Sequence, residues 1–218
     1  MSLAEETYQV LHEKSRVEDD IRVLVMGDSH ACRMFDQSRF TRHCQSRYLK
    51  LASNLAVRGM TMDRYGPQLE VARSHRAEIV LLLIGGNDMD QPVVESPYDV
   101  AAKIFRAMLD LEDSGKLVYI VQCPTRFRCW NREVLTLQRH IRTLNATLRH
   151  KIGSRFIRLL QEHHCRTYFD DGVHLKFGEY TRLMRKALFY IRVDIQRARC
   201  PPSNYRSKLI AYLQRGVH

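Results

Sequence analysis

Two short apolar runs constrain the fold of this chain more than any other feature. Residues 23–26 and 79–84 are apolar at every position, without the alternation of a strand that faces water on one side. Such a strand is covered on both faces, as in a parallel sheet between two layers of helices. The first run ends at Gly27 and the second at Gly85, where glycine allows the chain to turn sharply.

Strand and helix patterns alternate along the rest of the chain. We expect strands at 21–26, 48–51, 78–84, 117–121 and 156–160, and helices at 30–42, 97–111, 131–151 and 177–195, with a further helix opening at Gly66-Pro67. This order predicts an α/β fold, in which a doubly wound, mainly parallel sheet is flanked by helices.

The helix expected at 131–151 has a clear amphipathic pattern. Asn131 suits the N-cap position, because its side chain can accept a hydrogen bond from the first turn. The apolar residues at helical spacing predict a buried stripe, which consists of Leu135, Leu137, Ile141, Leu144 and Leu148.

A length of 218 residues suits one domain with a sizeable core, which we place at residues 21–196. Residues 1–20 are mostly polar and predict a short helix or a tether. Residues 197–218 form a basic tail, because two prolines at 201–202 end the preceding helix.

The charge balance favours an acidic partner. Lys and Arg number 35 against 24 Asp and Glu, which gives a formal net charge of +11. Nucleic acid, an anionic membrane surface or another polyanion would suit such a chain, and charge that serves only solubility is the alternative.

No apolar run approaches the roughly 18 residues of a membrane span, and the N-terminus lacks the apolar core of a signal peptide. The six cysteines form no Cys-x-x-Cys pair. We therefore expect an intracellular, cytoplasmic protein with reduced thiols. The cluster at 163–165 (His-His-Cys) has no second ligand group at metal-binding spacing, so we expect no metal and no organic cofactor.

Ser29 stands where the first strand becomes a helix, the edge at which α/β sheets bind ligands. Its hydroxyl could cap that helix, or it could act as a nucleophile if a base lies beside it. His174 is a candidate base, and Asp171, three residues earlier, could reach the far ring nitrogen of His174 and fix its tautomer. A helix-capping turn is the alternative for Asp171 and His174.

Four short blocks occur in a diagnostic order. They are Gly27-Asp28-Ser29, the loop glycine Gly59, Gly85-Gly86-Asn87-Asp88 and Asp171-x-x-His174. In this order they resemble the SGNH (GDSL-type) hydrolase family, over roughly residues 21–195. His30 stands where the commonest form of the first block has leucine. The resemblance implies the flavodoxin-like three-layer sandwich of that family.

The resemblance also implies an activity, the hydrolysis of small acyl esters. Ser29 would be the nucleophile, with His174 and Asp171 completing the triad. The backbone N–H groups of Ser29 and Gly59 and the side-chain amide of Asn87 would form the oxyanion hole. An acyltransferase would use the same site with another acceptor, and neither reaction needs a cofactor.

A second feature is the alternation of basic and aromatic residues at 126–130. Arg126 and Arg128 could grip phosphates, while Phe127 and Trp130 could stack on bases. A solvated cationic face, with both aromatic rings against the core, is the alternative.

Three segments resemble, more weakly, the esterase-like domains of animal retroelement proteins. These are residues 27–30 (Gly-Asp-Ser-His), 124–128 (Pro-Thr-Arg-Phe-Arg) and 171–175 (Asp-Gly-Val-His-Leu). Such domains occur in proteins that accompany RNA. This resemblance keeps open a second function, an RNA-binding module with a retained or vestigial hydrolase site.

Overall fold

A computed structural model of the chain describes residues 3–16, 20–36, 49–93, 95–159 and 166–196. Several sequence predictions lie wholly or partly outside these residues, among them the His-His-Cys cluster at 163–165 and the basic tail at 197–218. The helix expected at 30–42 is wrong in its described part, because it spans only Ser29–Met34; residues 37–42 lie outside the described residues.

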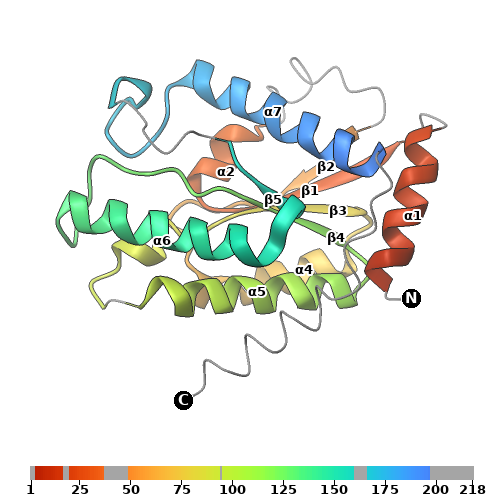
Figure 1. Cartoon of the computed structure of the whole chain (residues 1–218), viewed down its shortest axis with the longest axis horizontal. Coiled ribbons are helices and arrows are strands. Elements are labelled where there is room, and N and C mark those ends of the chain that lie inside the picture. Colours follow the sequence, from red (N-terminus) through yellow and green to blue (C-terminus); the bar gives the residue numbers. More distant parts are fainter. Residues whose placement is uncertain (1–2, 17–19, 37–48, 94, 160–165, 197–218) are drawn as a thin grey trace.

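The described residues form one five-stranded sheet in which every neighbouring pair is parallel. Its strands are β1 (Ile21–Gly27), β2 (Leu49–Asn54), β3 (Ile79–Leu83), β4 (Leu117–Val121) and β5 (Phe156–Ile157). Their order in the sheet is β2-β1-β3-β4-β5 (Figure 1). The predicted α/β fold with a parallel sheet is therefore confirmed.

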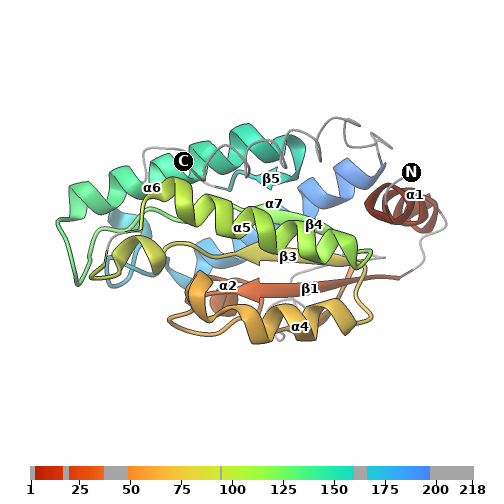
Figure 2. The ribbon, with the colours of Figure 1, turned by 90° about the horizontal axis from the view of Figure 1, so that it is seen from below.

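Helices cover both faces of the sheet (Figures 1 and 2). The helices are α1 (Leu3–Arg16), α2 (Ser29–Met34), α4 (Gly66–Ser74), α5 (Pro97–Asp113), α6 (Val134–Ile152) and α7 (Phe177–Gln196). Short 3-10 turns add η1 (Met62–Arg64), η2 (Asp88–Asp90), η3 (Gly153–Arg155) and η4 (Arg166–Tyr168). None of the described helices has the length and apolar character needed to cross a membrane.

The core divides into two layers because successive side chains of a strand point to opposite faces. Val23 and Val25 of β1 pack with α1, α2 and α7, whereas Leu24 and Met26 pack with α4, α5 and α6. All four side chains are fully buried, which explains why β1 has no polar alternation.

The strand order places a topological switch point between β1 and β3. The chain leaves β1 toward β2 at one edge and leaves β3 toward β4 on the other side. In doubly wound sheets, ligands bind beyond the carboxyl ends of the strands at this point. Ser29 follows β1 and Asn87 follows β3, so both lie beside this crevice.

The helix expected at 131–151 begins later than predicted. It starts at Val134, and Asn131 is not its cap; instead, the Asn131 amide donates to the carbonyl oxygen of Asp90. Leu135 is 73% exposed, so it does not belong to the buried stripe. It lies in the first turn of α6, while the later predicted members, from Leu137 to Leu148, are buried against the sheet.

The last predicted strand is also shorter than expected. β5 contains only two residues, Phe156 and Ile157, although the predicted strand continues through Arg158 and Leu159. It pairs only with β4 in the described sheet, so few backbone hydrogen bonds define its length.

Gly27 is the residue that joins β1 to the site. Its φ of +139° is a backbone conformation that residues with an L side chain rarely adopt. In addition, a Cβ at this position would lie 1.9 Å from the carbonyl oxygen of Leu83. The close approach exists because the next N–H, that of Asp28, donates to the same oxygen at 3.0 Å. Only glycine fits here.

We expect Gly27→Ala to lower the free energy of unfolding by about 3 kcal/mol or more, because backbone would have to move. Gly153→Ala is the matched control, since Gly153 also has a positive φ (+65°) but open space around it. Alanine at φ +65° and ψ −127° would be strained but would overlap no atom, so the loss at Gly153 should be clearly smaller than the loss at Gly27. Urea unfolding of both variants measures the difference, and equal losses would contradict the steric argument.

Candidate active site

Ser29 is the first residue of α2, directly after the turn at Gly27. The N-cap is Asp28, whose carboxylate accepts a hydrogen bond from the His30 N–H at 2.8 Å. The Ser29 hydroxyl is therefore not needed as a cap. The residue Ser29 is 8% exposed, at the carboxyl edge of the sheet.

A chain of two hydrogen bonds starts at this hydroxyl. The Ser29 Oγ lies 3.0 Å from Nε2 of His174, and Nδ1 of His174 lies 2.8 Å from Oδ2 of Asp171. The structure thus brings together the three side chains that the sequence proposes for catalysis. The first distance suits a hydrogen bond between a nucleophile and its base. The second suits a hydrogen bond between the base and the group that orients it.

The carboxylate of Asp171 fixes the loop that carries both Asp171 and His174. Oδ1 of Asp171 accepts from the backbone N–H of Val173 at 2.9 Å and of His174 at 2.7 Å. Burial by itself would raise the pKa of the Asp171 carboxyl, but the hydrogen bonds from the His174 side chain and these N–H groups lower it. Asp171 therefore remains a carboxylate opposite the imidazole.

Gly59 lies in a turn attached to the end of β1. The Val57 N–H donates to the carbonyl oxygen of Gly27 at 2.9 Å, and the Met60 N–H donates back to Val57 at 3.2 Å. Gly59 is the third residue of this turn, with a φ of +72° that glycine adopts without strain. It is exposed, and no atom lies within 4 Å of the position its Cβ would take.

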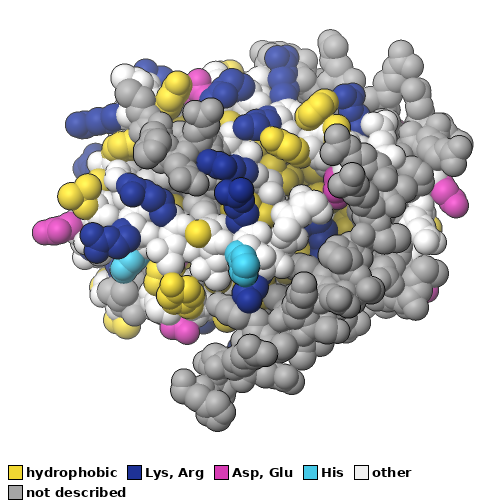
Figure 3. Space-filling model, viewed as in Figure 1, with side chains coloured by type: hydrophobic (Ala, Val, Ile, Leu, Met, Phe, Trp, Pro, Cys, Tyr) yellow, Lys and Arg dark blue, Asp and Glu magenta, His cyan; other side chains and the backbone are white. Residues whose placement is uncertain are grey.

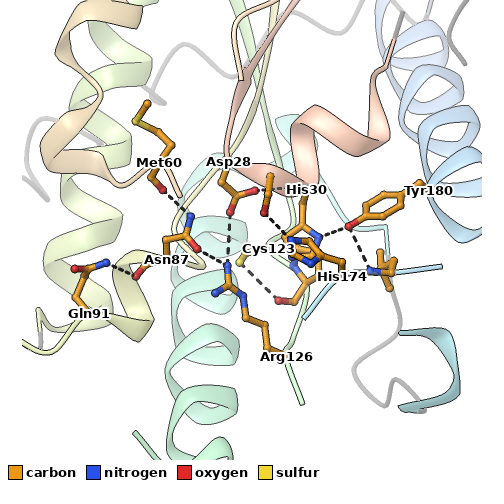
Figure 4. Close-up of polar contacts among 12 residues, drawn as sticks. Asp28, His30, Met60, Asn87, Gln91, Cys123, Arg126, His174 and Tyr180 are labelled. Atoms are coloured by element: carbon orange, nitrogen blue, oxygen red, sulfur yellow. Dashed lines mark hydrogen bonds and ion pairs between the residues drawn. The ribbon is translucent and has the colours of Figure 1, made fainter. Parts of the chain in front are cut away.

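The side chain of Asn87 is held from both ends (Figure 4). Its Nδ2 donates to the carbonyl oxygen of Met60 at 2.9 Å, and its Oδ1 accepts from Nη2 of Arg126 at 2.8 Å. A guanidinium can only donate, so the atom that faces Arg126 must be the amide oxygen. The amide nitrogen is then directed to the side of Met60 and the Gly59 turn.

Arg126 is not a surface residue, so its predicted contact with nucleic acid is wrong. Its side chain is 1% exposed, and Nη2 also lies 3.9 Å from Oδ2 of the buried Asp28. A buried guanidinium is costly unless acceptors lie beside it, and Asn87 and Asp28 provide acceptors near Nη2. Its Nε is buried without a hydrogen-bond partner in the described structure. The sequence alone could not distinguish this environment from a solvated cationic face.

The neighbours of Arg126 divide between core and surface. Phe127 is partly buried and packs edge-on against Phe169, with ring centroids 5.1 Å apart. Arg128 and Trp130 are exposed, Trp130 at 64%. The N–H groups of Phe127 and Arg128 donate to the carbonyl oxygen of Gly172, at 2.6 and 3.0 Å. This segment therefore anchors the loop that carries His174.

Two further residues support His174, and sequence reasoning missed both. His30 is fully buried, its Nδ1 lies 2.9 Å from the Tyr180 hydroxyl, and its ring centroid lies 5.4 Å from that of His174. Tyr180 in turn accepts the Leu175 N–H at 3.3 Å. No spacing rule connects positions 150 residues apart.

The electrostatics at His30 favour the neutral ring. Burial, followed by the positive charges of Arg126, His174 and Arg33, lowers the pKa of His30 well below its ordinary value. A neutral His30 adds no positive charge beside the imidazole of His174.

Asp88 supports the oxyanion side of the crevice. Its Oδ1 accepts the Met62 N–H at 2.7 Å, which ties the segment after β3 to the turn after Gly59. Burial, followed by the charges of Glu95 and Asp28, raises the pKa of the Asp88 carboxyl to about 6. Its Oδ2 is buried without a hydrogen-bond partner in the described structure. Within the described ranges, no three His, Cys, Asp or Glu side chains are grouped to hold a metal.

Comparison with protein families gives one match. The model of the GDSL-like lipase/acylhydrolase family aligns with residues 25–176, which include Ser29, Gly59, Asn87, Asp171 and His174. A comparison with curated proteins by sequence gave no match.

Solved structures resemble the fold at low sequence identity. A putative acylhydrolase from Bacteroides fragilis is 15% identical, with a TM-score of 0.65, 86% of this chain and 96% of that chain covered. A lipase/acylhydrolase from Enterococcus faecalis is 14% identical, with a TM-score of 0.61; the match covers 80% of this chain and 96% of that chain. An acetylxylan esterase from Geobacillus stearothermophilus, solved as a catalytic mutant, is 12% identical, with a TM-score of 0.59; the match covers 79% of this chain and 94% of that chain.

The raised pKa of Asp88 predicts a pH-dependent cost to stability. The pKa of this carboxyl is about 6 in the folded chain, against about 3.9 in the unfolded chain. The folded state therefore loses stability as pH rises from about 4 through about 6, by at most roughly 3 kcal/mol.

Asp88→Asn removes this titration and keeps an oxygen for the Met62 N–H. We expect its stability relative to wild type to improve by up to roughly 3 kcal/mol between pH 4 and pH 7. Urea unfolding of both proteins at the two pH values measures the change. A difference between the two proteins that does not vary with pH would contradict the assignment.

Proposed function

The chain belongs to the GDSL-like lipase/acylhydrolase family, and we propose that it hydrolyses small acyl esters with Ser29 as nucleophile. The observation that carries the proposal is the hydrogen-bonded chain from Ser29 through His174 to Asp171. Family membership supports ester hydrolysis, and this geometry supports the assignment of roles.

In the first half of the proposed reaction, Ser29 Oγ attacks the ester carbonyl carbon and its proton passes to Nε2 of His174. The tetrahedral intermediate collapses, the C–O bond to the alcohol breaks, and the same proton goes to the leaving oxygen. Water then attacks the acyl-serine with His174 as base, which releases the acid and restores Ser29. Asp171 stabilises the imidazolium in both halves.

Three donors are proposed for the intermediate's oxyanion: the backbone N–H groups of Ser29 and Gly59, and Nδ2 of Asn87. The open space around Gly59 supports a close approach of substrate to backbone. Asn87 has a second N–H besides the one that Met60 accepts. Arg126 acts as a positioning residue, because it sets which end of the amide faces the crevice.

The proposal of a short acyl group such as acetyl is supported by the fold shared with acetylxylan esterases. A small cavity of about 200 Å³ lies beside the segment after β3, but neither Ser29 nor His174 lines it. Its lining residues are Thr61, Asp63, Asp88, Gln91, Pro92, Val93 and Glu95. An acyltransferase would use the same groups, with an alcohol in place of water in the second half of the reaction.

We expect Ser29→Ala to lower kcat/KM for p-nitrophenyl acetate by at least about 10⁴-fold, because no other hydroxyl replaces the nucleophile. Ser154→Ala, at an exposed serine in η3, is the matched control and should keep full activity. Equal rates in wild type and Ser29→Ala would contradict the proposal.

Asn87→Asp tests the oxyanion donor without removing the partner of Arg126. The new carboxylate can still accept from the guanidinium, but it offers no N–H to the oxyanion and loses the hydrogen bond to the Met60 carbonyl oxygen, so the melting temperature should also fall. We expect kcat to fall by about 10²–10³-fold or more. Steady-state kinetics beside a thermal melt measures both effects, and an unchanged kcat would exclude Asn87 from the oxyanion hole.

A further inference from the structure

A cationic groove lies at the edge of the sheet beside β5. It has a volume of about 520 Å³ and is lined by Gln122, Thr125, Arg142, Asn145, Ala146, Arg149, His150, Phe156 and Arg158. None of the residues proposed for catalysis lines it. The groove is therefore a second concave site, with a separate set of side chains.

The polar lining of the groove is suited to anions. Arg142 and Arg149 come from α6 and Arg158 follows β5, while the lining residues that the structure describes include no Asp or Glu. All three long cationic side chains are arginines. A guanidinium binds phosphate oxygens with two parallel N–H groups, which lysine cannot do.

Positive charge continues from the groove onto α7. Nζ of Lys186 donates to the carbonyl oxygen of Leu159, the residue after Arg158, at 2.9 Å. Burial, followed by the charges of Arg182 and Arg158, lowers the pKa of Lys186. Cations are thus crowded along this edge, and an approaching anion would relieve their repulsion.

Two exposed aromatic rings accompany these cations on α7. Phe189 is 53% and Tyr190 45% exposed. The Arg192 guanidinium lies 5.3 Å from the Phe189 ring centroid, and Lys186 Nζ lies 5.9 Å from that of Tyr190. Aromatic faces next to cations are the components with which proteins bind unpaired bases and their phosphates.

Figure 3 shows the face on which β5, α6 and α7 are seen in Figure 1. On its described part, Lys and Arg side chains are far more frequent than Asp and Glu, and hydrophobic side chains lie between them. We call the groove together with Lys186, Phe189, Tyr190 and Arg192 the β5-edge surface.

We propose that the β5-edge surface binds single-stranded nucleic acid. The arginines of the groove hold backbone phosphates, and the rings on α7 stack on bases. The concave groove favours this ligand over a membrane, because a chain of linked phosphates can enter the concavity, whereas a flat lipid surface would meet mainly its rim. The site replaces the segment at 126–130, where Arg126 is buried, as the location for nucleic-acid contact.

The test is fluorescence anisotropy of a labelled 20-nucleotide oligouridylate with the full chain, at several salt concentrations. The variant is Arg142→Ala with Arg149→Ala, since both side chains are exposed on α6 and alanine favours helix. The control is Arg64→Ala with Arg76→Ala, which removes the same charge from exposed positions outside the β5-edge surface.

Wild type should bind with an affinity that falls steeply as salt increases, because phosphate contacts release counterions. The groove variant should bind about tenfold more weakly near 0.15 M salt. The slope of log affinity against log salt concentration should become shallower by about 1.4, because two phosphate contacts of about 0.7 each are lost. The control should match wild type within about twofold. Tyr190→Ala should weaken binding without changing the slope.

Several results would overturn the proposal. These are no binding by wild type, binding that does not depend on salt, and equal losses in the groove variant and its control. Binding to vesicles with 30% phosphatidylserine is measured in parallel. If the chain binds the vesicles more tightly than the oligonucleotide, and the groove variant loses that binding, the ligand is a lipid surface and the proposal fails.

Discussion

A single buried guanidinium connects the loops around the serine. Arg126, which follows β4, donates to Asn87 after β3 and lies near Asp28 after β1. Burying this cation is costly unless acceptors surround it, so the three loops must be in place together. The orientation of the Asn87 amide, and with it the proposed oxyanion hole, depends on this arrangement.

The loop around Arg126 links the two sides of the site. Its next two residues donate to the carbonyl oxygen of Gly172 in the His174 loop, while Asn87 and Asp88 hold the segment around Met60 and Met62. Ser29 and Asn87 thus come shortly after the ends of strands, and the loop of Asp171 and His174 is tied to the segment after β4. Such preorganisation is what an oxyanion site requires, because its donors must not rearrange as charge develops.

The basic charge has two separate uses in this reading. Arg126 is buried in the core, where it positions an amide rather than meeting solvent. Other arginines remain at the surface, and three of them line a groove whose described residues include no carboxylate. A net charge describes neither location, since it is a sum over residues and not a distribution.

The sequence by itself determined the strands, their parallel arrangement and the blocks that carry Ser29, Asn87, Asp171 and His174. Apolar runs without alternation require burial on both faces, whatever the neighbours are. Only the tertiary structure decided that Arg126 is buried, that His30 meets Tyr180, and that Leu135 is exposed at the start of α6. Those outcomes depend on contacts between residues distant in the chain, and local patterns contain no information about which distant side chain will supply the partner.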